Sequence, residues 1–187
     1  MKNIQLFVGL LAVLMLMSCE EDSVVSLVDP SIQRAEDLAI IEDYIEEKGY
    51  TNVDTTASGV RYAIIEEGTG KSIAFNDIVQ IHYAGRLTDG TLFDTSIDTV
   101  AINNDSFDSL KTYNPIRFTY AQGGWTLGSY VEGFKEGVTA SLGKMKVGGS
   151  ASIMIPSSLG YGTSPPFGSG IPTRAVLVFE VYPVSAK

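Results

Sequence analysis

The sequence has very little of two residue types on which much enzyme chemistry depends. Of its 187 residues, one is cysteine and one is histidine. A single cysteine cannot form a disulfide within the chain. One cysteine and one histidine are also too few for an ordinary zinc site, and a lone histidine gives little support for a Ser-His-Asp triad. We therefore expect no metal, no cofactor and no covalent catalysis.

Positive charge is scarce as well. Thirteen Lys and Arg stand against 22 Asp and Glu, a net charge of −9, so the basic footprint of a nucleic-acid-binding protein is missing. The acidity is unevenly distributed. Residues 20–57 carry eleven acidic and two basic residues, whereas residues 58–187 carry eleven and ten. This predicts a nearly neutral domain behind an acidic arm, which an anionic membrane would repel or which simply stays solvated.

One long hydrophobic run is present, at the very start of the chain. Lys2 precedes an almost wholly apolar stretch from Ile4 to Met17, which is shorter than the roughly 20 residues of a membrane span. It is typical of a signal-peptide core. Ser18-Cys19 then resembles the end of a bacterial lipobox, which implies that residues 1–18 are a lipoprotein signal peptide and that Cys19 carries the lipid. The alternative is an ordinary secretory signal followed by an unrelated cysteine.

The lipobox reading predicts a location in the cell envelope. A lipid on Cys19 would anchor the chain to a membrane, with the outer membrane, facing the periplasm or the cell surface, as the expected place. The acidic residues 20–22 directly after the cysteine are similar to the surface-export signals of some bacteria. Surface exposure is therefore a hypothesis that the sequence raises.

Residues 19–57 are expected to form an acidic tether and one amphipathic helix. Asp29-Pro30 is a typical helix start, with an N-cap acid and proline at the first helical position, and Gly49 is a typical end. Within residues 30–48 one face of the helix is apolar, through Ala35, Leu38, Ile41 and Ile45. This stripe is expected to pack on the following domain or on a second copy of the chain.

From residue 58 onward, strand and turn patterns dominate. Strands are predicted over 60–66, 77–83, 150–155 and 174–184, with alternating apolar residues on the second and the last. A helix is predicted over 132–142, and residues 97–114 are expected to form a long polar loop. Residues 58–187 are thus predicted to be one α+β domain, a twisted antiparallel β-sheet wrapped around a short helix.

Three stretches of this domain resemble the FKBP family of peptidyl-prolyl cis-trans isomerases. They are VQIHYAGRLTDGTLFDTS at 79–96, VGGSASIMIPSSLGYG at 147–162 and GIPTRAVLVFEV at 170–181, in the family's order. The resemblance implies an FKBP-like sheet curled around its helix, isomerisation of Xaa-Pro bonds in exported or cell-envelope proteins, proline-containing segments as partners and macrolides as inhibitors. A non-catalytic peptide-binding or chaperone module, with 97–114 as a contact surface, is the alternative function.

The resemblance also selects the residues of a substrate pocket. They are Tyr83, Phe93, Asp94, Phe118, Val131, Phe134, Tyr161, Ile171 and Phe179. Two positions have alternatives: Trp125 could replace Phe118 as a wall, and Val138 could replace Phe134 as the floor. Rotating a peptide bond needs no nucleophile, because the barrier of roughly 18–20 kcal/mol comes from amide resonance. A water-free apolar pocket would favour the twisted amide over the planar one.

Overall fold

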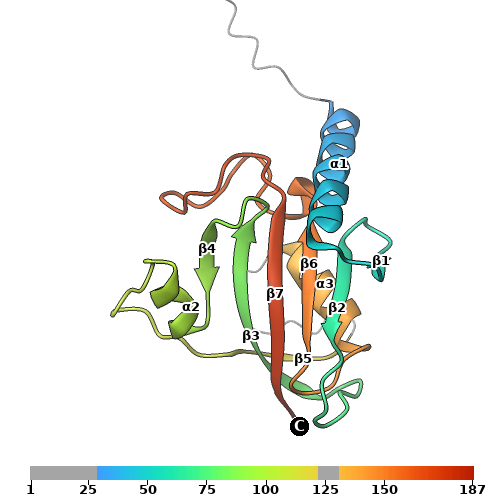
Figure 1. Ribbon diagram of the computed structural model, residues 1–187, viewed down its shortest axis with the longest axis vertical. Coiled ribbons are helices and arrows are strands. Elements are labelled where there is room, and N and C mark those ends of the chain that lie inside the picture. Colours follow the sequence, from blue (N-terminus) through green and yellow to red (C-terminus); the bar gives the residue numbers. More distant parts are fainter. Residues whose placement is uncertain (1–28, 122–130) are drawn as a thin grey trace, which may run out of the picture.

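The computed structural model describes residues 29–121 and 131–187 (Figure 1). One long antiparallel sheet is covered by one helix on each face. The elements in chain order are α1 (Pro30–Lys48), β1 (Val53–Thr55), β2 (Arg61–Glu66), β3 (Ile78–Leu87), β4 (Leu92–Thr95), α2 (Asp98–Asn103), β5 (Ile116–Thr119), α3 (Glu132–Leu142), β6 (Ser150–Ile155), a short 3₁₀ turn (Ser157–Leu159) and β7 (Leu177–Ala186).

The sheet has seven strands in the order β1-β2-β6-β7-β3-β4, and β5 pairs with the far end of β3. All of these pairings are antiparallel. The longest is between β3 and β7, which run side by side through the middle of the sheet (Figure 1). The predicted fold class, an antiparallel sheet with a short helix against it, is confirmed.

Side-chain alternation explains why the sheet has two cores. In β3, Val79, Ile81 and Tyr83 are buried while the residues between them are half-buried, as the alternating pattern predicted. In β7, Phe179 belongs to the core under α3, whereas its neighbour Val178 belongs to a second core under α1. Successive residues of a strand point to opposite faces, so β7 contributes to both cores.

Helix α3 has the predicted bounds and packs very closely on β6. A Cβ at Gly133 would lie 2.3 Å from Cγ2 of Ile155, and one at Gly137 would lie 2.2 Å from Cγ2 of Ile153. The two glycines therefore allow the helix backbone to approach the strand more closely than side chains would permit. Phe134, Val138 and Leu142 fill the space beside them.

Helix α1 also has the predicted bounds, and it packs on the domain. The Asp29 side chain accepts a hydrogen bond of 2.8 Å from the Ser31 N–H, and Gly49 ends the helix with φ of 67°. Ile41 and Tyr44 are buried against β6 and β7. One part of the predicted stripe is wrong: Ala35 is exposed. Asp37 is buried instead, because its carboxylate has hydrogen-bond partners on the domain.

Other differences from the prediction concern element ends and short elements. Residues 97–114 are not wholly loop, because α2 lies within them and buries Ala101. Strand β1 was not predicted and pairs with β2. Strand β3 runs on to Leu87, and β7 begins three residues later than predicted, at Leu177. A turn over residues 88–90 joins β3 to β4, and the Leu87 N–H donates to the Thr91 carbonyl across it over 2.9 Å.

Several predictions lie outside the described residues. These are the signal peptide 1–18, the lipid attachment at Cys19, the tether that follows it, and Trp125. Within the described ranges, no helix combines the length and the apolar character that crossing a membrane requires.

Candidate functional site

Four aromatic rings from four elements meet on the α3 side of the sheet. Phe179 of β7 is central: its ring centroid lies 4.6 Å from that of Phe134, 5.5 Å from that of Phe93 and 6.1 Å from that of Tyr83. Tyr83 and Phe134 contact each other edge to face at 5.9 Å. Tilted and edge-to-face contacts at these distances are favourable for aromatic rings. We call these four residues the aromatic cluster.

Gly85 makes this arrangement possible. It lies in β3 opposite Phe179 on one side and Asp94 on the other. A Cβ at this position would lie 2.6 Å from Cε2 of Phe93 and 2.9 Å from Cε1 of Phe179. The two rings therefore come together over a backbone without a side chain. The sequence prediction did not include Gly85, although a glycine inside a strand often marks such a close approach.

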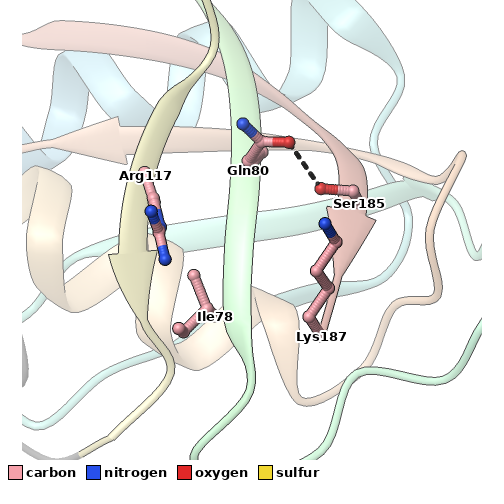
Figure 2. A pocket seen from close by; sticks show the side chains of 5 residues that line it. All are labelled: Ile78, Gln80, Arg117, Ser185 and Lys187. Carbon is pink, nitrogen blue, oxygen red and sulfur yellow. Dashed lines mark hydrogen bonds between the residues drawn. The ribbon is translucent and has the colours of Figure 1, made fainter.

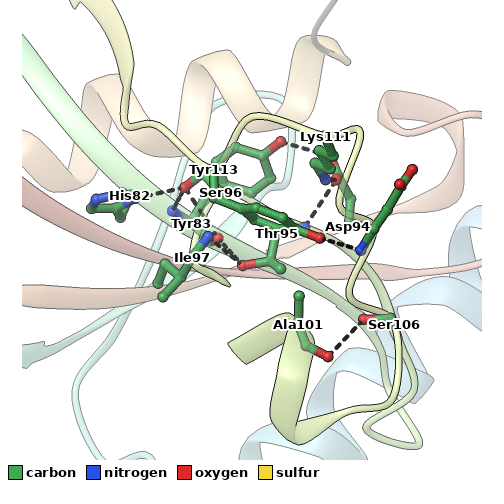
Figure 3. A network of polar contacts seen from close by, with 11 residues as sticks. His82, Tyr83, Asp94, Thr95, Ser96, Ile97, Ala101, Ser106, Lys111 and Tyr113 are labelled. Carbon is green, nitrogen blue, oxygen red and sulfur yellow. Dashed lines mark hydrogen bonds and ion pairs between the residues drawn. The ribbon is translucent and has the colours of Figure 1, made fainter. Parts of the chain in front are cut away.

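Asp94 of β4 connects the aromatic cluster to a polar network (Figure 3). The Tyr83 hydroxyl donates to its Oδ2 over 2.6 Å, and the Thr95 N–H donates to its Oδ1 over 2.9 Å. The Lys111 ammonium also contacts Oδ1. The Asp94 side chain is 41% exposed, so its carboxylate lies between the buried tyrosine and solvent.

Two buried hydroxyl residues fix the strand that carries Asp94. Thr95 Oγ1 donates to the Tyr83 carbonyl over 2.8 Å, and Ser96 Oγ accepts from the Tyr83 N–H over 2.8 Å. The Ser96 hydroxyl is also 3.0 Å from Nδ1 of His82, which gives this histidine a hydrogen-bond partner. Each of these bonds joins the end of β4 to β3, so Tyr83 and Asp94 are held at a fixed separation.

Tyr161 follows the 3₁₀ turn and is half-buried beside the same core. Burial, and to a smaller extent the negative charge of Asp94, raise the pKa of the Tyr161 hydroxyl above its ordinary value. The hydroxyl therefore stays protonated well above neutral pH, and it keeps the ability to donate a hydrogen bond.

The remaining predicted site residues belong to the same hydrophobic core. Phe118 and Ile171 are buried in it, and Val131 lies against it at the start of α3. Both candidates for the floor, Phe134 and Val138, are fully buried there, but ring contacts to Tyr83 and Phe179 are made by Phe134. The structure thus places eight of the nine predicted residues in one hydrophobic core, with Asp94 hydrogen-bonded to Tyr83 at its edge. Their catalytic roles remain predictions.

Lys111 is a further site residue, after Gly85, that the sequence prediction did not include. It is the only Lys or Arg between residues 97 and 114, which was a usable signal. Its partner Asp94 lies 17 residues away, and the intervening segment has no periodic pattern from which that contact could be predicted.

A separate small cavity lies at the end of the sheet where β5 pairs with β3 (Figure 2). Its volume is about 140 Å³, and it is lined by Ile78, Gln80, Arg117, Ser185 and Lys187. The Ser185 hydroxyl donates to the Gln80 side-chain oxygen across it over 2.8 Å. None of the predicted site residues lines this cavity. In the described part of the chain, no group of three or more His, Cys, Asp and Glu is placed to hold a metal ion.

Comparison of the sequence with known proteins gives one family. The sequence model described as FKBP-type peptidyl-prolyl cis-trans isomerase matches residues 70–182. The chain is 37% identical over 130 residues to the FKBP-type peptidyl-prolyl cis-trans isomerase FkpA of Aeromonas hydrophila, covering 69% of this chain and 38% of that protein. It is 35% identical over 131 residues to FK506-binding protein 1 of Dictyostelium discoideum, covering 69% of this chain and 99% of that protein.

Solved structures agree with the sequence comparison. The crystal structure of FkpA from Escherichia coli matches with a TM-score of 0.51 and 26% identity, over 84% of this chain and 62% of that one. A peptidyl-prolyl cis-trans isomerase from Pseudomonas syringae shares the fold with a TM-score of 0.53 and 23% identity, over 85% of this chain and 96% of that one. The chain spans less than two thirds of FkpA in both comparisons. With residues 70–182 matched, the chain belongs to the family of FKBP-type peptidyl-prolyl cis-trans isomerases.

Proposed function

We propose that this protein is a peptidyl-prolyl cis-trans isomerase that acts on Xaa-Pro bonds of exported or cell-envelope proteins. The observation that carries the proposal is the aromatic cluster, in which Tyr83, Phe93, Phe134 and Phe179 meet beside the partly exposed carboxylate of Asp94. The family supports the same activity. The proposed substrate is a proline-containing polypeptide segment. A macrolide that binds to the same residues would inhibit the isomerase activity.

The chemistry needs no reactive group. Uncatalysed Xaa-Pro isomerisation takes tens to hundreds of seconds, because amide conjugation is lost on the way. A proline ring against Phe134 and Phe179 would place the amide in apolar surroundings, which favour the less polar twisted state. The Tyr161 hydroxyl, kept protonated, would donate to a substrate carbonyl. Lowering the barrier by about 5 kcal/mol would accelerate the reaction a few thousandfold.

The proposed location rests on the N-terminal sequence alone. We propose that residues 1–18 are removed and that lipid on Cys19 anchors the domain to a membrane of the cell envelope. The short apolar run Ile4–Met17 and the Ser18-Cys19 junction support this. Metabolic labelling with a radioactive fatty acid would detect the lipid, and a Cys19→Ala variant should lose both the label and membrane fractionation. Equal labelling of the two proteins would refute the anchor.

The activity is tested by measuring cis-to-trans isomerisation of a short Xaa-Pro peptide with the purified full chain. We expect a clear acceleration, which a Tyr161→Phe, Asp94→Ala double variant loses while keeping its folded spectrum. No acceleration by a well-folded wild-type chain would refute the enzymatic proposal.

Exposed apolar residues favour a second candidate function, peptide binding without turnover. Leu110 is 92% exposed and Phe107 is 50% exposed on the 97–114 segment, and Phe167 is fully exposed on the segment between β6 and β7. These side chains could hold unfolded polypeptide. If so, the chain should suppress aggregation of an unfolding client protein, and replacing the exposed Leu110 by Ser should weaken that suppression while leaving isomerisation of a short peptide unchanged.

A further inference from the structure

The segment 97–114 is folded by its own contacts and not simply draped over the domain. The Phe107 and Tyr113 rings stack with their centroids 5.4 Å apart. The Tyr113 hydroxyl accepts from the Asp108 N–H over 2.9 Å, and the Asp108 carboxylate accepts from the Leu110 N–H over 2.8 Å. These contacts lie on both sides of Lys111 in the sequence, so the position of its backbone is fixed.

This fold directs Lys111 to the site. Its ammonium forms an ion pair with Asp94 and lies 5.4 Å from the centre of the Tyr113 ring, close enough for a cation–π contact. In Figure 3, Lys111 and Asp94 lie beside Tyr83 and Tyr113. At the other end, Arg86 Nη1 donates to Asn104 Oδ1 over 3.1 Å, which ties the segment to β3. The segment therefore places the Lys111 ammonium against the carboxylate of Asp94, beside the aromatic cluster.

The hydrogen-bonding capacities of the two partners are used unequally. Asp94 accepts from Tyr83, Thr95 and Lys111, which takes up most of the capacity of a carboxylate. An ammonium has three N–H donors, and within the described residues Asp94 is the one acceptor that Lys111 contacts. The Lys111 side chain is 37% exposed. An incoming substrate therefore meets unused positive donors next to a carboxylate that is already satisfied.

We propose that Lys111 is a specificity-determining residue, which makes the site prefer segments with an acidic side chain next to proline over segments with a basic one. This inference rests on the proposed isomerase function and names its substrate class. An Asp or Glu beside the proline would bind the free N–H groups of Lys111. A Lys or Arg there would face this ammonium and would have to displace it to reach Asp94.

The test uses three peptides that differ only in the residue before proline, which is Glu, Leu or Lys. kcat/KM is measured with the purified full chain, with Lys111→Met, Lys111→Glu and Lys111→Arg, and with Lys71→Met as a matched control. Lys71 is an exposed lysine that pairs with Asp77, outside the predicted site. High salt provides a second control, since it screens exposed charges.

We expect the ratio of kcat/KM for the Glu peptide to that for the Lys peptide to fall about threefold in Lys111→Met, the size expected of one exposed ion pair. It should fall further in Lys111→Glu and be preserved in Lys111→Arg and Lys71→Met. An unchanged ratio in Lys111→Met and Lys111→Glu would overturn the proposal. If the wild type isomerises none of the peptides, the enzymatic function fails instead, and the dissociation constants of the same peptides then test the charge preference directly.

Discussion

The two faces of β7 are packed with different kinds of side chain. Towards α3, Phe179 contacts three other aromatic rings, and half-buried residues such as Phe93 and Tyr161 continue this core outwards. Towards α1, the core consists of Ile41, Tyr44, Met154, Val176 and Val178. The first face combines a core with groups that a ligand could reach, whereas the second serves to attach a helix.

A buried carboxylate distinguishes the α1 face further. Asp37 is completely buried, and it accepts from the N–H and the hydroxyl of Ser157 over 2.8 and 2.7 Å and from Gln33 over 2.9 Å. On the α3 face the carboxylate of Asp94 is partly exposed and pairs with a lysine. The buried carboxylate of Asp37 therefore fixes the position of α1, whereas the Asp94 carboxylate and its lysine partner can be reached from solvent.

The largest expected effect comes from removing a ring on the α3 face. Phe134→Ala should lower the free energy of unfolding by about 3–5 kcal/mol, because it leaves a cavity between Tyr83 and Phe179. Urea denaturation followed by fluorescence measures this loss, and isomerase activity should disappear even at concentrations of urea where the variant is folded.

Val138→Ala is the matched control for that variant, since Val138 is equally buried one turn along the same helix. Val138→Ala should lower the free energy of unfolding by less than Phe134→Ala does, and it should retain isomerase activity. If instead Val138→Ala abolishes activity and Phe134→Ala preserves it, Val138 is the floor of the site.

An intermediate effect is expected at the attachment of α1. Asp37→Ala leaves the buried Ser157 N–H and hydroxyl without their acceptor, at a cost of roughly 1–3 kcal/mol. Asp37→Asn keeps an acceptor oxygen and should therefore lose clearly less stability. Hydrogen exchange of the α1 amides should increase in the alanine variant while the β3 amides remain protected. Equal protection of α1 in all three proteins would show that Asp37 does not hold the helix.

The smallest expected effect is on the pH dependence of stability, and it concerns a tyrosine of β7. Burial and the nearby Glu180 charge raise the pKa of Tyr182 to about 12, against about 10 in an unfolded chain. The folded state holds this proton more tightly, so its contribution to stability is complete below pH 10 and is lost as the pH rises towards 12. Urea denaturation at pH 9 and pH 11 should show a drop that is smaller in Tyr182→Phe. An identical drop would assign the loss to other groups.

The regular elements could be predicted from the sequence because their patterns are local. The bounds of α1 follow from its capping residues, α3 follows from helical spacing, and the buried set Val79, Ile81 and Tyr83 follows from strict alternation. The gathering of Tyr83, Phe93, Phe134 and Phe179 followed from resemblance, since no local pattern brings four separate elements together.

What could not be predicted depends on single long-range contacts. Asp37 interrupts an otherwise apolar stripe because Ser157, 120 residues away, supplies its hydrogen bonds. Lys111 reaches Asp94 through a segment whose fold depends on one ring stack and a few turns. The helix α2 is only six residues long and has no side-chain cap, so its sequence resembles that of the loop around it.

The alternation along β7 makes the domain modular. The match to the family begins at residue 70, after α1 has ended, and Phe179 and Val178 show that neighbouring positions of one strand face the two cores. Substitutions at the positions under α1 leave the positions of the aromatic cluster unchanged. The helix α1 could therefore be replaced by a different attachment through changes under it, such as at Met154 and Val178, without altering the residues that would bind the substrate.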